Sequence, residues 1–224
     1  RVDLEVQMIK DFKLKSKDQT DLTYADIDYY GNQIASELSK LDEEKLKEYF
    51  PYSHVKESIL RIFEQMFDIK FNKKPAAKTW HKDVEVFDIV KLGSTIGIIY
   101  LDMHPRKGKY NHACSIDVIP GVKDLTVPQN ILICNFNKPK GNKPGLQSLE
   151  EVTTFFHEFG HLLHSVLGGQ RINWANLAGT RVQIDFAEAP SQLLEEIVMD
   201  PQVLKKLTNH VTSGSQITDE LIHA

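Results

Sequence analysis

Residues 157–161 read His-Glu-Phe-Gly-His, and this short pattern constrains the chain more than any other stretch. The two histidines are four positions apart, so on an α-helix they lie on one face, one turn apart, and can reach one metal ion. Glu158 lies about 100° further round the helix, where it can hold a water molecule rather than bind the metal. The pattern therefore predicts a helix that carries a zinc site with its own general base.

A catalytic zinc site needs a third protein ligand and one open position for water. A third histidine in metzincin spacing is excluded, because the two positions that must be Gly and His are His164 and Leu167. His164 shares the histidine face but lies about 10 Å along the helix axis from His157, so a role beside the metal ligands or facing the substrate is predicted for it. A deformylase-like site would take Cys114 or Cys134 as a ligand, but neither lies in a sequence context that resembles that class.

A carboxylate from a later helix is the remaining source of a third ligand. Glu188 follows His161 by 27 positions, and a proline two positions further on favours a helix start that would hold its side chain firmly. Asp185, Glu195 and Glu196 are rival carboxylates. For Glu195 and Glu196, solvated glutamates on a helix surface are the simpler interpretation.

The bulk composition narrows the classes of protein and partner. The 224 residues suffice for one large or two small domains, and 41% hydrophobic and 26% charged residues are typical of a globular protein. The net charge of −4, without a long basic run, argues against a nucleic-acid partner. The longest aliphatic stretches, such as residues 96–101, are strand-sized, so no membrane span is predicted. Two cysteines are too few for a disulfide framework and predict free thiols in a reducing compartment.

The hydrophobic patterns predict an α+β fold that is predominantly helical. Residues 22–49 and 55–67 have helical spacing, with a break at Pro51. A small, mainly antiparallel sheet is predicted, with strands at residues 84–87, 96–101, 112–118 and 129–136. A loop follows over residues 137–147. We therefore expect a helical segment (1–79), a sheet segment (80–137) and zinc-site helices (148–224) within one domain, with the sheet beside the zinc-binding helices.

Local signals mark the helices around the metal motif. Ser148 and Glu151 fit a capping box, so a helix should begin there, and the glycine pair at 168–169 should end it. On this helix the large apolar residues fall in one sector and the histidines roughly opposite. A glycine-containing loop to Thr180 should lead into another helical stretch ending near Asp200, whose following proline marks a further helix start.

Seven stretches of the chain share their residues with one enzyme family. They are residues 28–30 (Asp-Tyr-Tyr), 46–51 (Leu-Lys-Glu-Tyr-Phe-Pro), 80–84 (Trp-His-Lys-Asp-Val), 100–110 (Tyr-Leu-Asp-Met-His-Pro-Arg-Lys-Gly-Lys-Tyr), 157–164 (His-Glu-Phe-Gly-His-Leu-Leu-His), 179–180 (Gly-Thr) and 185–192 (Asp-Phe-Ala-Glu-Ala-Pro-Ser-Gln). The two metal motifs, residues 157–164 and 185–192, closely resemble those of the thimet oligopeptidase family, peptidase family M3, in sequence and in order along the chain. The resemblance runs from about residue 24 to the end of the chain.

The resemblance implies a zinc-dependent metalloendopeptidase that hydrolyses short peptides, with one Zn²⁺ as its cofactor. It implies that His157, His161 and Glu188 bind zinc and that Glu158 is the general base. Asp185, close to Glu188 in the sequence, is a candidate to orient a zinc-bound histidine. We expect a monomer without nucleic-acid or membrane partners, in the cytoplasm or in an organelle.

The chain differs from that family in its extent. Full-length members are much longer and carry a later Gly- and Tyr-rich segment that helps bind substrate and stabilise the tetrahedral intermediate, as well as an N-terminal helical half. We therefore expect a partial M3-type catalytic domain that binds zinc and is weakly active or inactive alone. Losing one oxyanion donor typically costs about 10²–10³ in kcat.

Two other interpretations stay open. The chain could be a non-catalytic zinc-binding fragment with a structural or interaction role, although Glu158 argues against this because a structural site would have a fourth protein ligand. It could also belong to another gluzincin class resembling angiotensin-converting enzyme. The residues around Glu188 argue against that class.

Overall fold

The computed structural model describes residues 2–16, 21–38 and 42–222. The chain forms two compact units, one of residues 1–43 with 220–224 and one of residues 44–219. All elements that carry the predicted metal ligands belong to the larger unit. The division into three consecutive segments within one domain stays a prediction.

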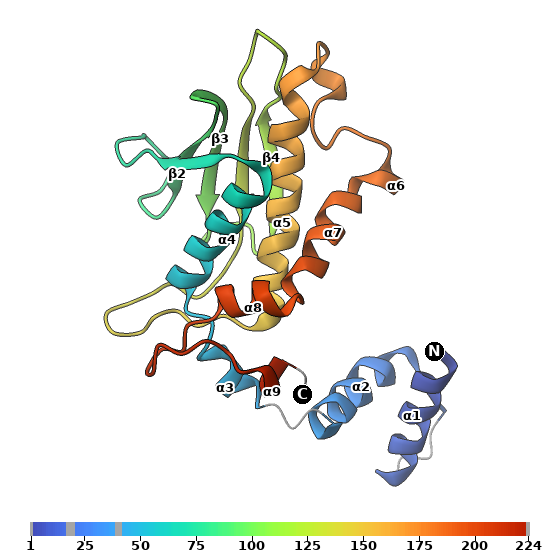
Figure 1. Cartoon of the computed structure of the whole chain (residues 1–224). Coiled ribbons are helices and arrows are strands. Elements are labelled where there is room, and N and C mark those ends of the chain that lie inside the picture. The colour runs from blue at the N-terminus through green and yellow to red at the C-terminus, as the bar shows by residue number, and fades with distance from the viewer. Residues whose placement is uncertain (1, 17–20, 39–41, 223–224) are drawn as a thin grey trace. The chain divides into compact units, whose positions relative to one another are not determined.

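The smaller unit is a pair of packed helices, α1 (Val2–Lys15) and α2 (Tyr24–Leu38) (Figure 1). The buried side chain of Lys13 binds Asp26 with 2.7 Å between Nζ and Oδ2. Its hydrogen bond to the Asp26 carboxylate is the main reason why the pKa of that group lies below its usual value. The rings of Phe12 and Tyr30 lie against each other, with centroids 6.1 Å apart. An ion pair and an aromatic contact thus hold the two helices together.

The larger unit contains one five-stranded sheet in the order β1-β2-β3-β5-β4. Its strands are β1 (Lys70–Lys73), β2 (Glu85–Lys91), β3 (Ser94–Asp102), β4 (Cys114–Ile119) and β5 (Gln129–Ile133). Neighbouring strands are antiparallel except β3 and β5, which run parallel with Ile98 opposite Gln129. Leu92 and Gly93 join β2 to β3 with φ angles of 50° and 79°, as a tight hairpin turn requires. The prediction of a small, mainly antiparallel sheet is confirmed.

Two long helices, α4 (Tyr52–Phe67) and α5 (Leu149–Gly168), build the core with this sheet (Figure 1). The ring of Phe63 in α4 stacks on that of Phe159 in α5, with centroids 4.9 Å apart. The predicted apolar sector of α5 is buried. At Gly97 a Cβ would lie 2.5 Å from Cγ1 of Val166, so the absence of a side chain lets β3 approach α5. The helix that carries the histidines is therefore fixed directly on the sheet.

Short helices follow α5 along the chain. They are η1 (Gly169–Arg171), η2 (Ala175–Leu177), α6 (Ile184–Ala187), α7 (Ala189–Val198), α8 (Pro201–Leu207) and α9 (Asp219–Ile222). The predicted end of α5 at residues 168–169 and the helix start after Asp200 are confirmed. The Asp200 carboxylate accepts hydrogen bonds from the backbone N–H groups of Gln202 and Val203, which caps α8. Of these helices α7 packs most closely along α5.

Two sequence expectations need correction. Strand β1 lies inside the segment expected to be helical. The sequence did not predict it, because its single large apolar residue, Phe71, gives no alternating pattern and its pairing with β2 is a nonlocal contact. The helical stretch expected over residues 22–49 is divided, since α2 ends at Leu38 and α3 spans Glu43–Lys47; residues 39–41 lie outside the described part of the chain.

A buried ionic cluster fixes the end of β3. The carboxylate of Asp102 accepts two hydrogen bonds from the guanidinium of Arg106, at 2.6 and 2.7 Å, and one from the indole of Trp80 at 2.9 Å. The ammonium of Lys109 donates to the backbone carbonyls of Asp102 and Cys134. Burial raises the pKa of the Asp102 carboxyl, but the hydrogen bonds outweigh burial and hold that pKa well below its usual value. The cluster anchors the loop that leads into β4.

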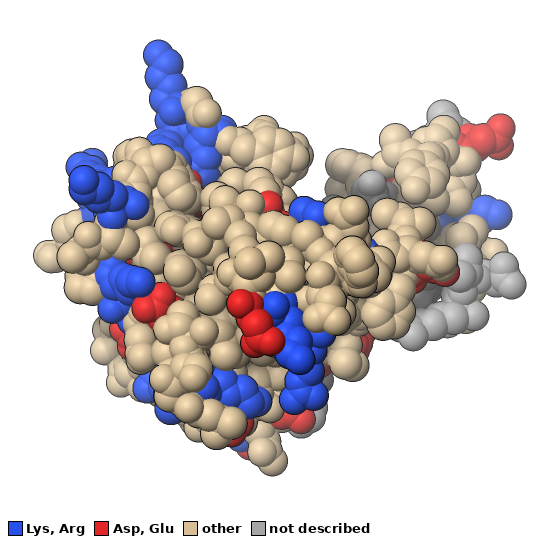
Figure 2. Space-filling model, turned by 90° about the horizontal axis from the view of Figure 1, so that it is seen from above, with Lys and Arg blue, Asp and Glu red and all other residues tan. Residues whose placement is uncertain are grey.

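Charged side chains on the face seen in Figure 2 lie in several separate places among other residues. Lysines and arginines do not gather there into one continuous basic surface. Within the described residues, no helix has an uncharged apolar run of the length needed to cross a bilayer.

Candidate metal centre

Helix α5 presents the two histidines of the metal motif. It begins with the predicted capping box: the hydroxyl of Ser148 accepts from the backbone N–H of Glu151 at 3.1 Å, and the Glu151 carboxylate accepts from the backbone N–H of Ser148 at 2.9 Å. His157 and His161 follow on one face and are half-buried. Their Nε2 atoms are 3.1 Å apart.

Helix α7 approaches this face closely because of a glycine in the motif. A Cβ on Gly160 would lie only 2.7 Å from Cα of Ser191, a distance that real side chains do not reach. Residue 160 is buried, and so is Ser191. Glu188 directly precedes α7 at its N-cap position, so this close packing places its carboxylate beside the histidines.

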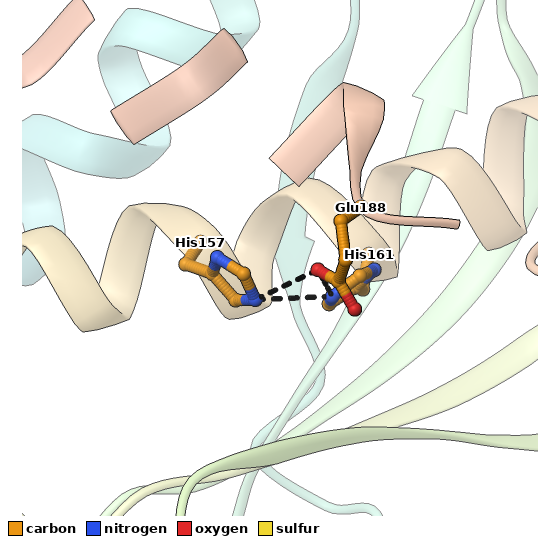
Figure 3. A group of neighbouring side chains, drawn as sticks. All are labelled: His157, His161 and Glu188. Atoms are coloured by element: carbon orange, nitrogen blue, oxygen red, sulfur yellow. Dashed lines mark hydrogen bonds and ion pairs between the residues drawn. The ribbon is translucent and has the colours of Figure 1, made fainter. Parts of the chain in front are cut away.

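His157, His161 and Glu188 form one cluster (Figure 3). Oε2 of Glu188 lies 3.2 Å from Nε2 of His157 and 3.0 Å from Nε2 of His161. Ligands of a tetrahedral zinc ion, bound at about 2.0–2.1 Å, are separated from one another by about 3.3 Å. The three ligand atoms therefore fit a zinc ion in number, chemical type and spacing. The Glu188 side chain is 50% exposed, which leaves an open side for water.

Neighbouring residues orient two of these ligands. Nδ1 of His157 is hydrogen-bonded to Oε1 of Glu195, so Nε2 is left to face the cluster. The Ser191 hydroxyl donates to Oε2 of Glu188 at 2.9 Å. Burial raises the pKa of Glu188, but the Ser191 hydrogen bond and the nearby histidines outweigh it, so this pKa lies below the usual value. The carboxylate is therefore ionised, as a metal ligand must be.

Glu158 lies beside the cluster without belonging to it. It is half-buried, and burial raises the pKa of its carboxyl, with His157 and His161 acting in the opposite direction and Glu188 reinforcing the rise. A backbone hydrogen bond from Ser115 links it to β4. A carboxylate of raised pKa in this position can accept a proton from a nearby water molecule.

Comparison with known proteins identifies the family. Residues 1–224 match peptidase family M3 along the whole chain. The chain belongs to peptidase family M3. It is 35% identical to saccharolysin of Saccharomyces cerevisiae over 98% of the chain, and 34% identical to a thimet-like oligopeptidase of Dictyostelium discoideum over 84%. It is 33% identical to oligopeptidase A of Haemophilus influenzae over 96%. The chain covers 33%, 29% and 32% of these relatives, about a third of their length.

One candidate residue of this M3 chain, Asp185, lies outside the cluster. Asp185, in α6, has an exposed side chain, and no hydrogen bond or ion pair joins it to either histidine within the described residues. Glu195, which the sequence interpretation treated as a solvated glutamate, is instead the carboxylate hydrogen-bonded to Nδ1 of His157. Glu195 lies two turns after Glu188, so both are on one face of α7. The spacing of Glu188 and Glu195 can be read from the sequence, but it does not show which helix this face of α7 contacts.

His164 is half-buried one turn beyond His161. Burial lowers its pKa, with the charge of His161 acting in the same direction and that of Asp117 opposing it. Its Nδ1 is buried without a hydrogen-bond partner among the described residues, and its ring lies edge-on to Phe186. His164 therefore lies next to the candidate metal cluster without belonging to it.

The two cysteines of the M3 chain are free thiols. Cys134 is buried and Cys114 is half-buried. Burial raises the pKa of both thiols, and the negative charge of Glu158 acts in the same direction. Neither belongs to the metal-ligand cluster.

Proposed function

We propose that this chain carries the metal centre of a zinc-dependent metalloendopeptidase that hydrolyses short oligopeptides. The observation that carries the proposal is the convergence of His157, His161 and Glu188 at zinc-ligand spacing, with Glu158 beside them. Membership of peptidase family M3 and relatives named as oligopeptidases support it. We propose that the protein acts as a monomer in the cytoplasm or in an organelle, where its thiols stay reduced.

The residues divide the chemistry between them. The two histidines and Glu188 would hold a zinc ion, which would act as a Lewis acid that lowers the pKa of water and polarises a peptide carbonyl. Glu158 accepts a proton from the attacking water and delivers it to the nitrogen of the leaving amine. Its raised pKa suits both transfers, because the carboxylate is a stronger base than an exposed one.

The position of strand β4 favours a peptide as the substrate. It is an edge strand that pairs with β5 alone among the described strands. The backbone hydrogen bond from Ser115 to Glu158 places this strand next to the proposed base. An extended peptide can add to such an edge through main-chain hydrogen bonds, which would align a scissile bond with the metal centre.

Metal analysis tests the zinc site. We expect one zinc ion per chain, strong loss of zinc affinity in His161→Gln and Glu188→Gln, and retention of zinc in Glu158→Gln. If the ligand variants bind zinc as the wild-type chain does, the proposed site is wrong.

A quenched fluorescent peptide tests the reaction. Because the chain spans about a third of the length of its relatives, we propose that it cleaves peptides slowly or not at all by itself. Slow zinc-dependent cleavage that is lost in Glu158→Gln, or zinc-dependent binding of a phosphinic peptide, would support the peptidase proposal. If the zinc-loaded chain shows neither, the alternative of a non-catalytic zinc-binding fragment is favoured.

A further inference from the structure

The segment that carries Glu188 lies between two anchors. Residues 181–186 are all exposed, so they contribute little packing of their own. After the segment, α7 is held by the contact of Ser191 with Gly160. Before it, residues 178 and 179 are buried. The position of Glu188 therefore depends on what holds the chain at residues 178–180.

The carboxylate of Asp117 in β4 lies at that upstream anchor. Its Oδ2 accepts a hydrogen bond from the hydroxyl of Thr180 at 3.3 Å. Its Oδ1 accepts from the amide of Asn130 in β5 at 3.0 Å and from the hydroxyl of Ser165 in α5. Asn130 and Ser165 are buried. One side chain thus joins the sheet, the histidine helix and the segment that leads to Glu188.

Backbone packing at Gly179 makes this junction tight. Its φ angle is 65°, and a Cβ there would lie 2.8 Å from Cα of Ser165. Ser165 follows His161 by one helical turn, so the chain touches α5 directly beyond the metal-binding turn. The hydrogen bond from Thr180 to Asp117 holds the next residue in place.

We propose that Asp117 is a positioning residue for the metal centre. Through Thr180 and Ser165 it fixes the start of the exposed segment against α5, so that Glu188 meets His157 and His161 at ligand distance. This inference rests on the proposed zinc site. Removing the anchor lets the third ligand depart from its position, while the two histidines remain on their helix.

Thr180→Val in the 224-residue chain tests the inference, because it removes the hydroxyl and keeps the side-chain shape. We expect zinc affinity to fall about tenfold, the lower end of the range for residues that orient metal ligands. The visible spectrum of bound Co²⁺ should change, since it reports the number and geometry of ligands. Thr180→Ser keeps the hydroxyl and should restore both. Asp117→Ala should weaken zinc binding at least as much.

Matched controls separate positioning from general loss of stability. Thr79→Val removes a hydroxyl that donates to the carbonyl of His81, outside the cluster, and should leave zinc affinity unchanged. Thr180→Val that binds zinc within about twofold of the wild-type chain, or Thr180→Ser that fails to restore affinity, would overturn the inference. If Asp117→Ala does not fold, the comparison of zinc affinity between Thr180→Val and Thr180→Ser still tests the inference. If the wild-type chain binds zinc but Glu188→Gln does not weaken it, the zinc-site proposal fails on its own.

Discussion

Gly160 of α5 and Ser191 of α7 are in such close contact that no side chain larger than hydrogen fits at position 160. The glycine of the metal motif is therefore a packing residue that sets the distance between two helices. We predict that Gly160→Ala separates α7 from α5 and moves Glu188 away from the histidines. Zinc affinity, measured by chelator competition, should fall by at least about tenfold.

Gly168→Ala is the matched control for that substitution. It lies in the same helix, and its Cβ would make ordinary contacts at 3.6 Å or more. It should fold normally and bind zinc as the wild-type chain does. Equal zinc affinity in both alanine variants would contradict the packing role of Gly160.

Glu195 should influence zinc binding without contacting the ion. Glu195→Ala leaves Nδ1 of His157 without its partner, so the imidazole loses its fixed orientation. We predict that zinc affinity falls about 10–100-fold, as judged by titration calorimetry. Glu196→Ala removes an exposed carboxylate at the next position and should have little effect. A Glu195→Ala variant with unchanged affinity would show that the hydrogen bond is not needed.

Zinc should stabilise the folded chain. A ligand that binds only the folded state at 100 times its Kd adds about 2.7 kcal/mol to the free energy of unfolding. We predict a higher thermal midpoint with zinc, reversed by a chelator, and a much smaller rise in Glu188→Gln. Glu150→Gln, which alters an exposed carboxylate of α5 outside the cluster, should respond to zinc as the wild-type chain does. Equal rises in Glu188→Gln and in the wild-type chain would indicate that zinc binds elsewhere.

Asp102 should give the stability of the chain a dependence on acid pH. Its pKa is lower in the folded state than in the unfolded state, so its charge stabilises the fold above the unfolded-state pKa of about 4. That stabilisation is lost as the pH falls from there through the folded-state pKa. We predict that Asp102→Asn lowers the free energy of unfolding by about 3 kcal/mol at pH 7.

Urea unfolding between pH 7 and pH 3 checks this dependence. The difference between wild type and Asp102→Asn should narrow below about pH 4. Asp88→Asn removes a carboxylate paired with Lys74, whose side chain is 45% exposed, and should cost less than about 1 kcal/mol. A constant difference between wild type and Asp102→Asn across this range would contradict the role of the carboxylate charge.

Local signals in the sequence predicted much of this fold. The pairing of Ser148 with Glu151 marked the start of α5, and Asp200 before a proline marked the start of α8. Both depend on residues within one helical turn of each other, so no tertiary information is needed. The strands β2 to β5 were also visible because their apolar residues are dense.

Nonlocal contacts account for what the sequence did not reveal. The parallel pairing of β3 with β5 depends on strand order, which no local pattern encodes. The hydrogen bond between His157 and Glu195 joins positions 38 apart, and the one between Ser165 and Asp117 joins positions 48 apart. The helical face of Glu195 could be predicted, but the partner of that face depended on how closely α7 packs.

The ligands of the proposed centre come from two helices, and Glu188 follows His161 by 27 positions. An ion held by all three residues would close this stretch into a covalent-like loop, as a disulfide closes a loop in other proteins. The exposed residues 181–186 lie within that loop. Metal binding at the centre would thus determine how readily the chain between the histidines and Glu188 opens locally and can be cut by a protease.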